Sequence, residues 1–401
     1  MAMTDDNFFE NNLFRFENSP CECVEDTRHT APGEPPETTI KVQALSGEKI
    51  QFAFAPAVGL VRLGAKGLLV EKNLLGELIA IKNGDTKTLF GYFDQNGFLF
   101  NVSDAEYEPI DTQKMFELIG RMRATVELLS ALGEVRKDYQ KILGLSLYLT
   151  LSDPIEFFFS TMSLPYTSGL HPFHSTLANA SLYPEPDFIE SELYQDGDVT
   201  IPDTLLDHQY QLDGQLYQDI CTGYGNEYTI PGSTSPLFRN IVLLYSRDIN
   251  ADQQTRHIID LLFHYFYEVG IIKDAASDGR IEYFKDPDLK KITPAMKKRI
   301  LEFARQIISE EINANMSNIH PYYDAEKMTP SWKIDSLLGG LYFSIFYMKP
   351  DLELYRRCRQ CGKYFLVKAT SSKKVYCSDE CRNRYQQRMH RKRQKEKEAN
   401  A

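Results

Sequence analysis

This sequence of 401 residues lacks a long hydrophobic run. Its longest nearly uncharged apolar stretch, residues 336–348 (SLLGGLYFSIFYM), is shorter than the roughly 20 residues that a membrane-spanning helix needs. The first residues, MAMTDDNFFENNLF, carry acids where a secretory signal carries bases, and no apolar run follows them. We therefore expect a cytoplasmic protein without a membrane partner, in which residues 336–348 form a buried helix.

Cysteine is scarce in this chain, and most of its copies are gathered near one end. The sequence has seven cysteines, and four of them lie between residues 358 and 381. Thiols stay reduced in the cytoplasm, where a cysteine cluster more often binds a metal ion than forms disulfides. The cluster is therefore the first candidate for a metal site.

No catalytic constellation is evident in the sequence. Three other groups have spacings that a metal ion or an acid–base pair could use: His171 with His174; His257 with Asp260 and His264; and Cys21 with Cys23 and His29. We interpret them as side chains engaged in packing and local hydrogen bonds, and we predict no catalytic residues. Because distant residues can converge in a fold, an enzyme stays an open alternative.

The composition, with 42% hydrophobic and 25% charged residues, is that of a globular protein, and the length allows about two or three domains. Pattern changes along the chain predict an α+β fold with these parts: a flexible acidic and polar arm at 1–40, a small β-rich subdomain at 41–105, a mainly α-helical body at 106–350 with an irregular, loop-rich segment at 164–236, and a C-terminal segment at 351–401 that contains the cysteine cluster and a basic helix.

Local patterns predict individual elements within these parts. Two aromatic runs flank Asn96-Gly97, a dipeptide typical of a hairpin turn. Apolar residues three and four positions apart predict helices within residues 113–143, 251–269 and 293–315. The predicted core of the body is therefore helical.

The C-terminal cysteines form two close pairs, Cys358-x2-Cys361 and Cys377-x3-Cys381, separated by fifteen residues. A short pair at a tight turn directs two sulfurs at one ion, and two pairs complete the closed tetrahedral shell of a structural zinc site. The spacing therefore predicts one zinc ion held by all four thiolates in a treble-clef-like finger.

The residues around the pairs predict how the finger is built. Gly362 follows the first pair, where a knuckle needs a positive φ. Residues 363–376 are long enough for a small hairpin between the pairs. Ser378 is a candidate N-cap, which places Cys377 at the entrance of a helix and Cys381 in its first turn.

The same segment is strongly basic in an acidic protein. Residues 356–398 have fifteen Lys and Arg against four Asp and Glu, a local charge of +11. Since the whole chain carries −11, the remainder carries −22. The remainder would repel nucleic acid, whereas this segment would attract it.

Helical geometry divides the basic segment into faces. At about 100° per residue, Cys381, Tyr385 and Met389 share the face that packs on the metal site. An adjacent stripe suits the phosphates of a nucleic acid, and it consists of Arg384, Arg388, Arg391 and Lys395. Arg382 and Asn383, near the helix start, are the candidates for contacting base edges.

The segments LYRRCRQCGKYF and YCSDECRNRYQQRMHRKR resemble the CGNR-type zinc finger at the C-terminus of proteins classed as bacterial transcription regulators. The shared features are the Arg-Arg-Cys entry, an aromatic pair after the knuckle, aromatic-Cys-Ser before the helix, and Cys-x-Asn-Arg at its start. Arg382 replaces the glycine of the family name, and Tyr376 stands where the family has tryptophan. The resemblance covers about 45 of the 401 residues and implies a treble-clef finger that binds DNA.

Together these features predict a zinc-stabilised nucleic-acid-binding protein, with DNA favoured over RNA as the partner. The leading hypothesis is a bacterial transcription regulator whose acidic body senses a ligand, forms a homodimer or recruits a partner. Two alternatives stay open: a zinc finger that binds another protein, and an enzyme that acts on nucleic acid through a site in the body.

Overall fold

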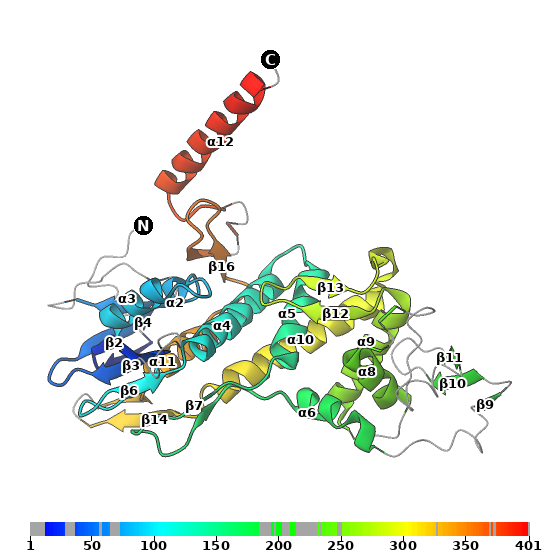
Figure 1. Cartoon of the computed structure of the whole chain (residues 1–401), viewed down its shortest axis with the longest axis horizontal. Coiled ribbons are helices and arrows are strands. Elements are labelled where there is room, and N and C mark those ends of the chain that lie inside the picture. The colour runs from blue at the N-terminus through cyan, green and yellow to red at the C-terminus, as the bar shows by residue number, and fades with distance from the viewer. Residues whose placement is uncertain are drawn as a thin grey trace. The chain divides into compact units, whose positions relative to one another are not determined.

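The computed structural model describes residues 13–28, 37–55, 58–64, 73–183, 194–195, 198–202, 209–213, 231–232, 234–246, 251–325, 328–368, 370–371 and 374–399. Contacts among the residues group the chain into two compact units, and Figure 1 shows their elements. The first unit consists of Met1–Val135, Pro154–Gly169 and Glu311–Ala401. The second unit consists of Arg136–Asp153 and Leu170–Glu310.

The first unit contains small antiparallel sheets. Its strands are β1 (Phe14–Asn18), β2 (Cys21–Arg28), β3 (Glu37–Ala44), β4 (Ile50–Ala55), β5 (Gly59–Leu63), β6 (Glu108–Ile110), β7 (Glu156–Phe157), β8 (Tyr166–Thr167), β14 (Ile319–Asp324), β15 (Thr329–Ile334), β16 (Glu353–Arg357) and β17 (Tyr364–Lys368). Among the described residues, two sheets have three strands, in the orders β1-β4-β5 and β2-β3-β6, and three further strand pairs are formed: β7-β8, β14-β15 and β16-β17.

The first unit also contains helices, and all but the last of them have buried residues that pack in its core. They are α2 (Leu74–Leu78), α3 (Thr86–Asn96), α4 (Thr112–Gly133), α11 (Leu337–Phe346) and α12 (Asp379–Ala399). The ring of Phe14 in β1 lies 5.1 Å from that of Phe54 in β4 and 4.7 Å from that of Phe343 in α11. This aromatic cluster joins the first sheet to α11, which is buried as its apolar sequence predicts.

The second unit is mainly helical. Its helices are α5 (Tyr139–Leu151), α6 (Pro172–Ala178), α8 (Pro236–Ser246), α9 (Gln253–Glu268), α10 (Pro294–Ala314) and the short 3-10 turns η2 (Ala180–Leu182) and η3 (Leu289–Lys291). Its strands are β9 (Tyr194–Gln195), β10 (Asp198–Pro202), β11 (Gln209–Asp213), β12 (Ile272–Ala275) and β13 (Ile281–Tyr283). The last residues of α10, from Glu311 onward, belong to the first unit.

The three predicted helical runs are helical in the structure, and the first of them is divided into two helices. The run at 113–143 forms two helices, α4 and α5, because Glu134 leaves the helical region with ψ 140° and ends α4. The runs at 251–269 and 293–315 form α9 and α10. The fold is therefore a mixed α+β fold with the cysteine cluster at its C-terminal end.

Two expectations for the N-terminal part are wrong. Residues 13–28, expected within a flexible arm, form β1 and β2, because inward-facing Phe14 and Phe16 alternate with exposed polar residues. Asn96 and Gly97 do not form a hairpin turn; they end α3, where Gly97 has φ 79° and its N–H donates to the carbonyl of Phe93. The dipeptide favours positive φ, which serves a helix end as well as a turn.

Much of the predicted loop-rich segment, 164–236, lies outside the described residues. Its described parts contain β8, α6, η2 and the small sheet of β9, β10 and β11. Among the described residues, no helix is long and apolar enough to cross a membrane.

Candidate metal centre

A β-hairpin positions the first cysteine pair. Strands β16 and β17 are antiparallel and end in register at the Arg357–Tyr364 pair, so the knuckle forms their connecting loop. The N–H of Cys358 donates to the carbonyl of Lys363 at 2.8 Å, and the N–H of Gly362 donates to that of Cys358 at 2.9 Å. Gly362 has φ 75°, which confirms the predicted glycine position and allows the tight turn.

The start of α12 positions the second pair. The N–H of Cys381 donates to the side-chain oxygen of Ser378 at 3.2 Å, which confirms Ser378 as the N-cap. Cys377 therefore lies just outside the helix, and Cys381 lies in the first turn of α12. The segment before α12 therefore positions the side chain of Cys377, and the helix itself positions that of Cys381.

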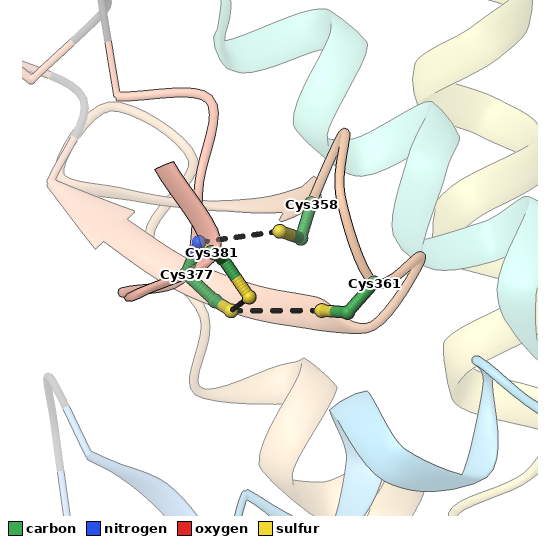
Figure 2. A group of neighbouring side chains, drawn as sticks. All are labelled: Cys358, Cys361, Cys377 and Cys381. Atoms are coloured by element: carbon green, nitrogen blue, oxygen red, sulfur yellow. Dashed lines mark hydrogen bonds between the residues drawn. The ribbon is translucent and has the colours of Figure 1, made fainter. Parts of the chain in front are cut away.

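The four thiols converge from these two directions, as Figure 2 shows. Their sulfur atoms all lie within 4.8 Å of one another. The sulfur of Cys377 is 3.6 Å from that of Cys361 and 3.5 Å from that of Cys381, and the N–H of Cys377 points at the sulfur of Cys358 at 3.5 Å. Such a group could hold one metal ion.

The ionisation of the thiols is uneven. Burial disfavours the Cys358 thiolate, but N–H groups of Cys361, Cys377 and Gln360 donate to its sulfur and lower its pKa to about 6. Burial raises the pKa of Cys361, and burial together with hydrogen bonding of the Cys377 thiol, which donates to the sulfur of Cys381, raises that of Cys377 to about 12. Several thiolates so close together repel each other, so full ionisation of the group calls for a bound cation.

The hairpin differs from the one expected between the cysteine pairs. Strand β17 pairs with β16, which precedes the first pair, so the two strands flank the knuckle. In the described residues after β17, 370–371 and 374–376, no further strand is formed. The sequence could not show this partner because Glu353–Arg357 is too short and charged to be recognised as a strand.

The hairpin is anchored to α4. The N–H of Tyr355 donates to the hydroxyl oxygen of Ser130 at 3.1 Å, and Arg356 donates to Glu134 at 2.5 Å. The hydroxyl of Tyr364 donates to the carboxylate of Glu127. The sequence predicted residues 351–401 as a part of their own, but these contacts make the hairpin part of the first unit.

Glycines allow this close approach. A Cβ on Gly133, at the end of α4, would lie 2.2 Å from the carbonyl oxygen of Pro350. A Cβ on Gly76 in α2 would lie 2.7 Å from that of Tyr364 in β17. Since carbon and oxygen cannot approach so closely without a shift, both helices touch the chain of the hairpin only because these positions lack a side chain.

Helix α12 leads away from the hairpin and from the other helices of its unit in Figure 1. Of its described side chains, none is buried. Arg382 is 54% exposed and lies 3.3 Å from Asp379, and Arg384 is 66% exposed and lies 2.5 Å from Glu380. The other predicted nucleic-acid contacts with described side chains are also exposed, and they are Asn383, Arg388 and Arg391. Lys395 lies in the helix, but its side chain is outside the described part.

A cavity of about 420 Å³ opens beside the first cysteine pair. It lies between the knuckle and the α2–α3 region, and its lining includes Cys361, Arg357, Lys363 and Lys82. Cys361 is the exposed member of the cluster, and this cavity opens its side of the cluster to solvent.

Within the part of the chain that the structure describes, the weaker candidate groups assemble no second centre. Among the described residues, only the C-terminal thiols form a group of potential metal ligands. His171 is buried with its Nδ1 2.6 Å from the carboxylate of Glu310, and His257 accepts a hydrogen bond from Arg299 at 2.9 Å. Cys21 and Cys23 lie in β2, where the Cys21 thiol donates to the carbonyl of Phe93; His29 lies outside the described residues.

Two features of this site come from the structure alone: the contacts of Tyr355 and Arg356 with α4, and the cavity beside Cys361. The partners of Tyr355 and Arg356 are more than 200 residues away in the sequence, where no local pattern reveals them.

No family model, no curated protein and no solved structure matches this chain. The chemistry of the centre is therefore inferred from its own geometry.

Proposed function

We propose that residues 351–401 form a zinc finger whose helix α12 binds nucleic acid, and that the protein is a DNA-binding transcription regulator. The observation that supports this most is the convergence of four thiols at the base of an exposed, basic helix. The metal would hold the start of the helix on a hairpin that is itself anchored in the first unit.

The distances favour zinc as the metal. A tetrahedral site with zinc–sulfur bonds of about 2.3 Å separates its sulfurs by about 3.8 Å. The separations of 3.5 and 3.6 Å around Cys377 are close to that value, and four thiolates leave no position for water. Zinc would therefore act structurally, as a cation that neutralises the thiolates and joins the two cysteine pairs.

The charge of α12 favours an anionic partner. The helix has eight Lys and Arg against four Asp and Glu, a net +4, and its described side chains are open to solvent. The ion pairs of Arg382 and Arg384 lie within one helical turn and are well exposed, so phosphates can replace them at little cost. Arginine forks also match the geometry of phosphate oxygens.

The contacts divide into two proposed roles. The stripe of Arg384, Arg388, Arg391 and Lys395 would follow the phosphate backbone, which positions the protein without reading sequence. Arg382 and Asn383 lie in the first turns of the helix, which recognition helices commonly present to base edges. The resemblance to the CGNR-type finger supports DNA as the nucleic acid and regulation as the role. In this proposal the rest of the chain senses a ligand or forms a homodimer.

The first test is the salt dependence of DNA binding by the full-length, zinc-loaded protein. On duplex DNA, four phosphate contacts predict a slope of log affinity against log salt of about −3.6, at about −0.9 per contact. Arg391→Ala is expected to reduce the slope by about 0.9 and to weaken binding to all sequences alike. The control is Arg280→Ala, which removes an 81% exposed, ion-paired arginine from the second unit and should change neither quantity.

A metal analysis completes the test. We expect one zinc per chain in protein purified without chelator, and loss of zinc from Cys377→Ser. Binding that does not respond to salt would refute nucleic-acid recognition and favour a finger that binds protein. Protein that contains no zinc when purified from zinc-replete cells would refute the metal assignment.

A further inference from the structure

Two tyrosine rings lie side by side at the base of α12. Tyr376 immediately precedes Cys377, and Tyr385 lies in the second turn of the helix. Their ring centroids are 5.3 Å apart with an interplanar angle of 48°. Both side chains are only partly buried, so part of each ring is open to solvent. They form an accessible aromatic surface next to the metal centre.

This aromatic surface adjoins the basic stripe. The guanidinium carbon of Arg388 is 5.2 Å from the centre of the Tyr385 ring. At about 100° per residue, Arg388 and Tyr385 are about 60° apart around the helix, so they are neighbouring columns on its surface. A ligand on the ring would therefore have a cation within reach of its phosphate.

A cavity of about 640 Å³ lies against the same two rings. It is lined also by Gln386, Met389 and His390, and by arginines, but by no acidic residue among those described. Its volume is within the roughly 300–1,000 Å³ typical of small-ligand sites. Its lining offers ring faces, amide and imidazole hydrogen-bonding groups, and positive charge, which together match a base and its phosphate.

We propose that this surface binds unpaired nucleobases, so that the finger prefers single-stranded nucleic acid to a duplex. A base stacks on Tyr385 or Tyr376 while Arg388 and Arg391 hold the flanking phosphates. In a duplex the ring faces of the bases are covered by their neighbours, so stacking is open only to an unpaired strand. The inference rests on the proposed function and narrows it: the base edges offered to Arg382 and Asn383 are then those of an unpaired strand.

The test compares one sequence in three forms by fluorescence anisotropy with full-length, zinc-loaded protein. The probes are a fluorescein-labelled 16-mer as single-stranded DNA, as single-stranded RNA and as a DNA duplex, all at the same salt concentration. We expect at least one single strand to bind about tenfold or more tightly than the duplex, because stacking adds to phosphate contacts. Comparison of the DNA and RNA strands shows which backbone the site accepts.

Variants separate stacking from charge. Tyr385→Leu and Tyr376→Leu should each weaken single-strand binding by about tenfold, with duplex binding and the salt slope unchanged. Tyr385→Phe keeps the ring and should retain single-strand binding. Tyr323→Leu, which removes a 60% exposed tyrosine from β14, is the matched control and should have no effect. If the tyrosines had only a structural role, the Leu variants would bind the single strand and the duplex more weakly by the same factor.

A second measurement needs no variant. A strand with 2-aminopurine at its centre should lose fluorescence on binding, because stacking on tyrosine quenches the base. Equal or tighter binding of the duplex, together with unchanged 2-aminopurine fluorescence, would overturn the inference and leave the proposed function standing. Absence of salt-dependent binding to every probe would refute the proposed function itself.

Discussion

Helices α4 and α12 have 22 and 21 residues, but they lie in opposite environments. Helix α4 buries thirteen of its residues, whereas none of the residues of α12 with a described side chain is buried. The first helix is stabilised by packing. The second has its own side-chain pairs, the contact of Tyr385 with Tyr376 and the cysteine cluster at its base, so we expect its position to depend on a metal ion bound there.

Arginine shows the same contrast. Arg121 in α4 is 1% exposed and donates two hydrogen bonds to Glu311, at 2.7 and 2.8 Å, although 190 residues separate the pair. Arg384 in α12 is 66% exposed and pairs with Glu380 one turn away. Buried, the side chain connects distant segments of the fold; exposed, it is available to a ligand.

The largest expected effect is loss of the metal. Cys377→Ser removes one of four ligands, and metal binding supplies on the order of 10 kcal/mol to such a site. We expect the zinc content to fall from one per chain to none and helical circular dichroism to decrease by the contribution of α12. The packed core should keep its cooperative unfolding. Cys23→Ser, in β2, is the control and should retain the metal; retention of zinc by both variants would contradict the ligand set.

The buried ion pair should contribute the next largest effect. Arg121→Ala leaves the fully buried carboxylate of Glu311 uncompensated and should lower the free energy of unfolding by about 3–5 kcal/mol. Arg384→Ala should change it by less than about 0.5 kcal/mol, because its partner is exposed. Urea unfolding of both variants measures the difference. Equal losses of unfolding free energy in the two variants would show that the ion pairs of α4 and α12 do not differ in burial.

The contact between α4 and the finger hairpin can be strained directly. Gly133→Ala places a methyl group 2.2 Å from the carbonyl oxygen of Pro350 and should cost about 1–3 kcal/mol of unfolding free energy. Gly91 in α3 has nothing within 4 Å of a built Cβ, so Gly91→Ala should stabilise the protein by up to about 1 kcal/mol. Thermal unfolding of the pair is the measurement. A neutral Gly133→Ala would mean that the hairpin does not rest on α4.

The smallest expected effect is loss of one hydroxyl that joins the hairpin to the start of α2. Tyr355→Phe removes the hydrogen bond that Tyr355 donates to Asn73 at 2.7 Å and should cost about 1 kcal/mol. Asn73 still accepts from the N–H of Gly76, so its oxygen is not left without a donor. Tyr322→Phe, at an exposed position in β14, is the matched control and should be neutral in the same unfolding assay.

Local patterns were sufficient wherever a feature depends on neighbouring residues. The convergence of the four cysteines was predicted from their spacing in two close pairs. The positive φ of Gly362 and the N-cap at Ser378 were predicted from a few adjacent positions. The buried helix at 336–348 was evident because its whole surface is apolar. Each of these follows from rules that act within about one turn of the chain.

Other features were decided only by tertiary contacts. The acidic composition of the N-terminal part hid the strand at Phe14–Asn18, which is held by pairing with β4 and by the ring of Phe343. Asn96-Gly97 ends a helix instead of turning a hairpin, because residues 86–96 pack their buried side chains as a helix.

The sequence by itself determined that four thiols and a basic helix occur together, since ligand spacing and charge are local properties. Only the tertiary structure decided that the hairpin of this finger belongs to the first unit while its helix is exposed. Tyr355 donates a hydrogen bond to Ser130, which is 225 residues away in the sequence, and Arg356 donates one to Glu134, which is 222 residues away. Contacts at such separations depend on how the whole chain packs, and no periodicity in the sequence encodes them.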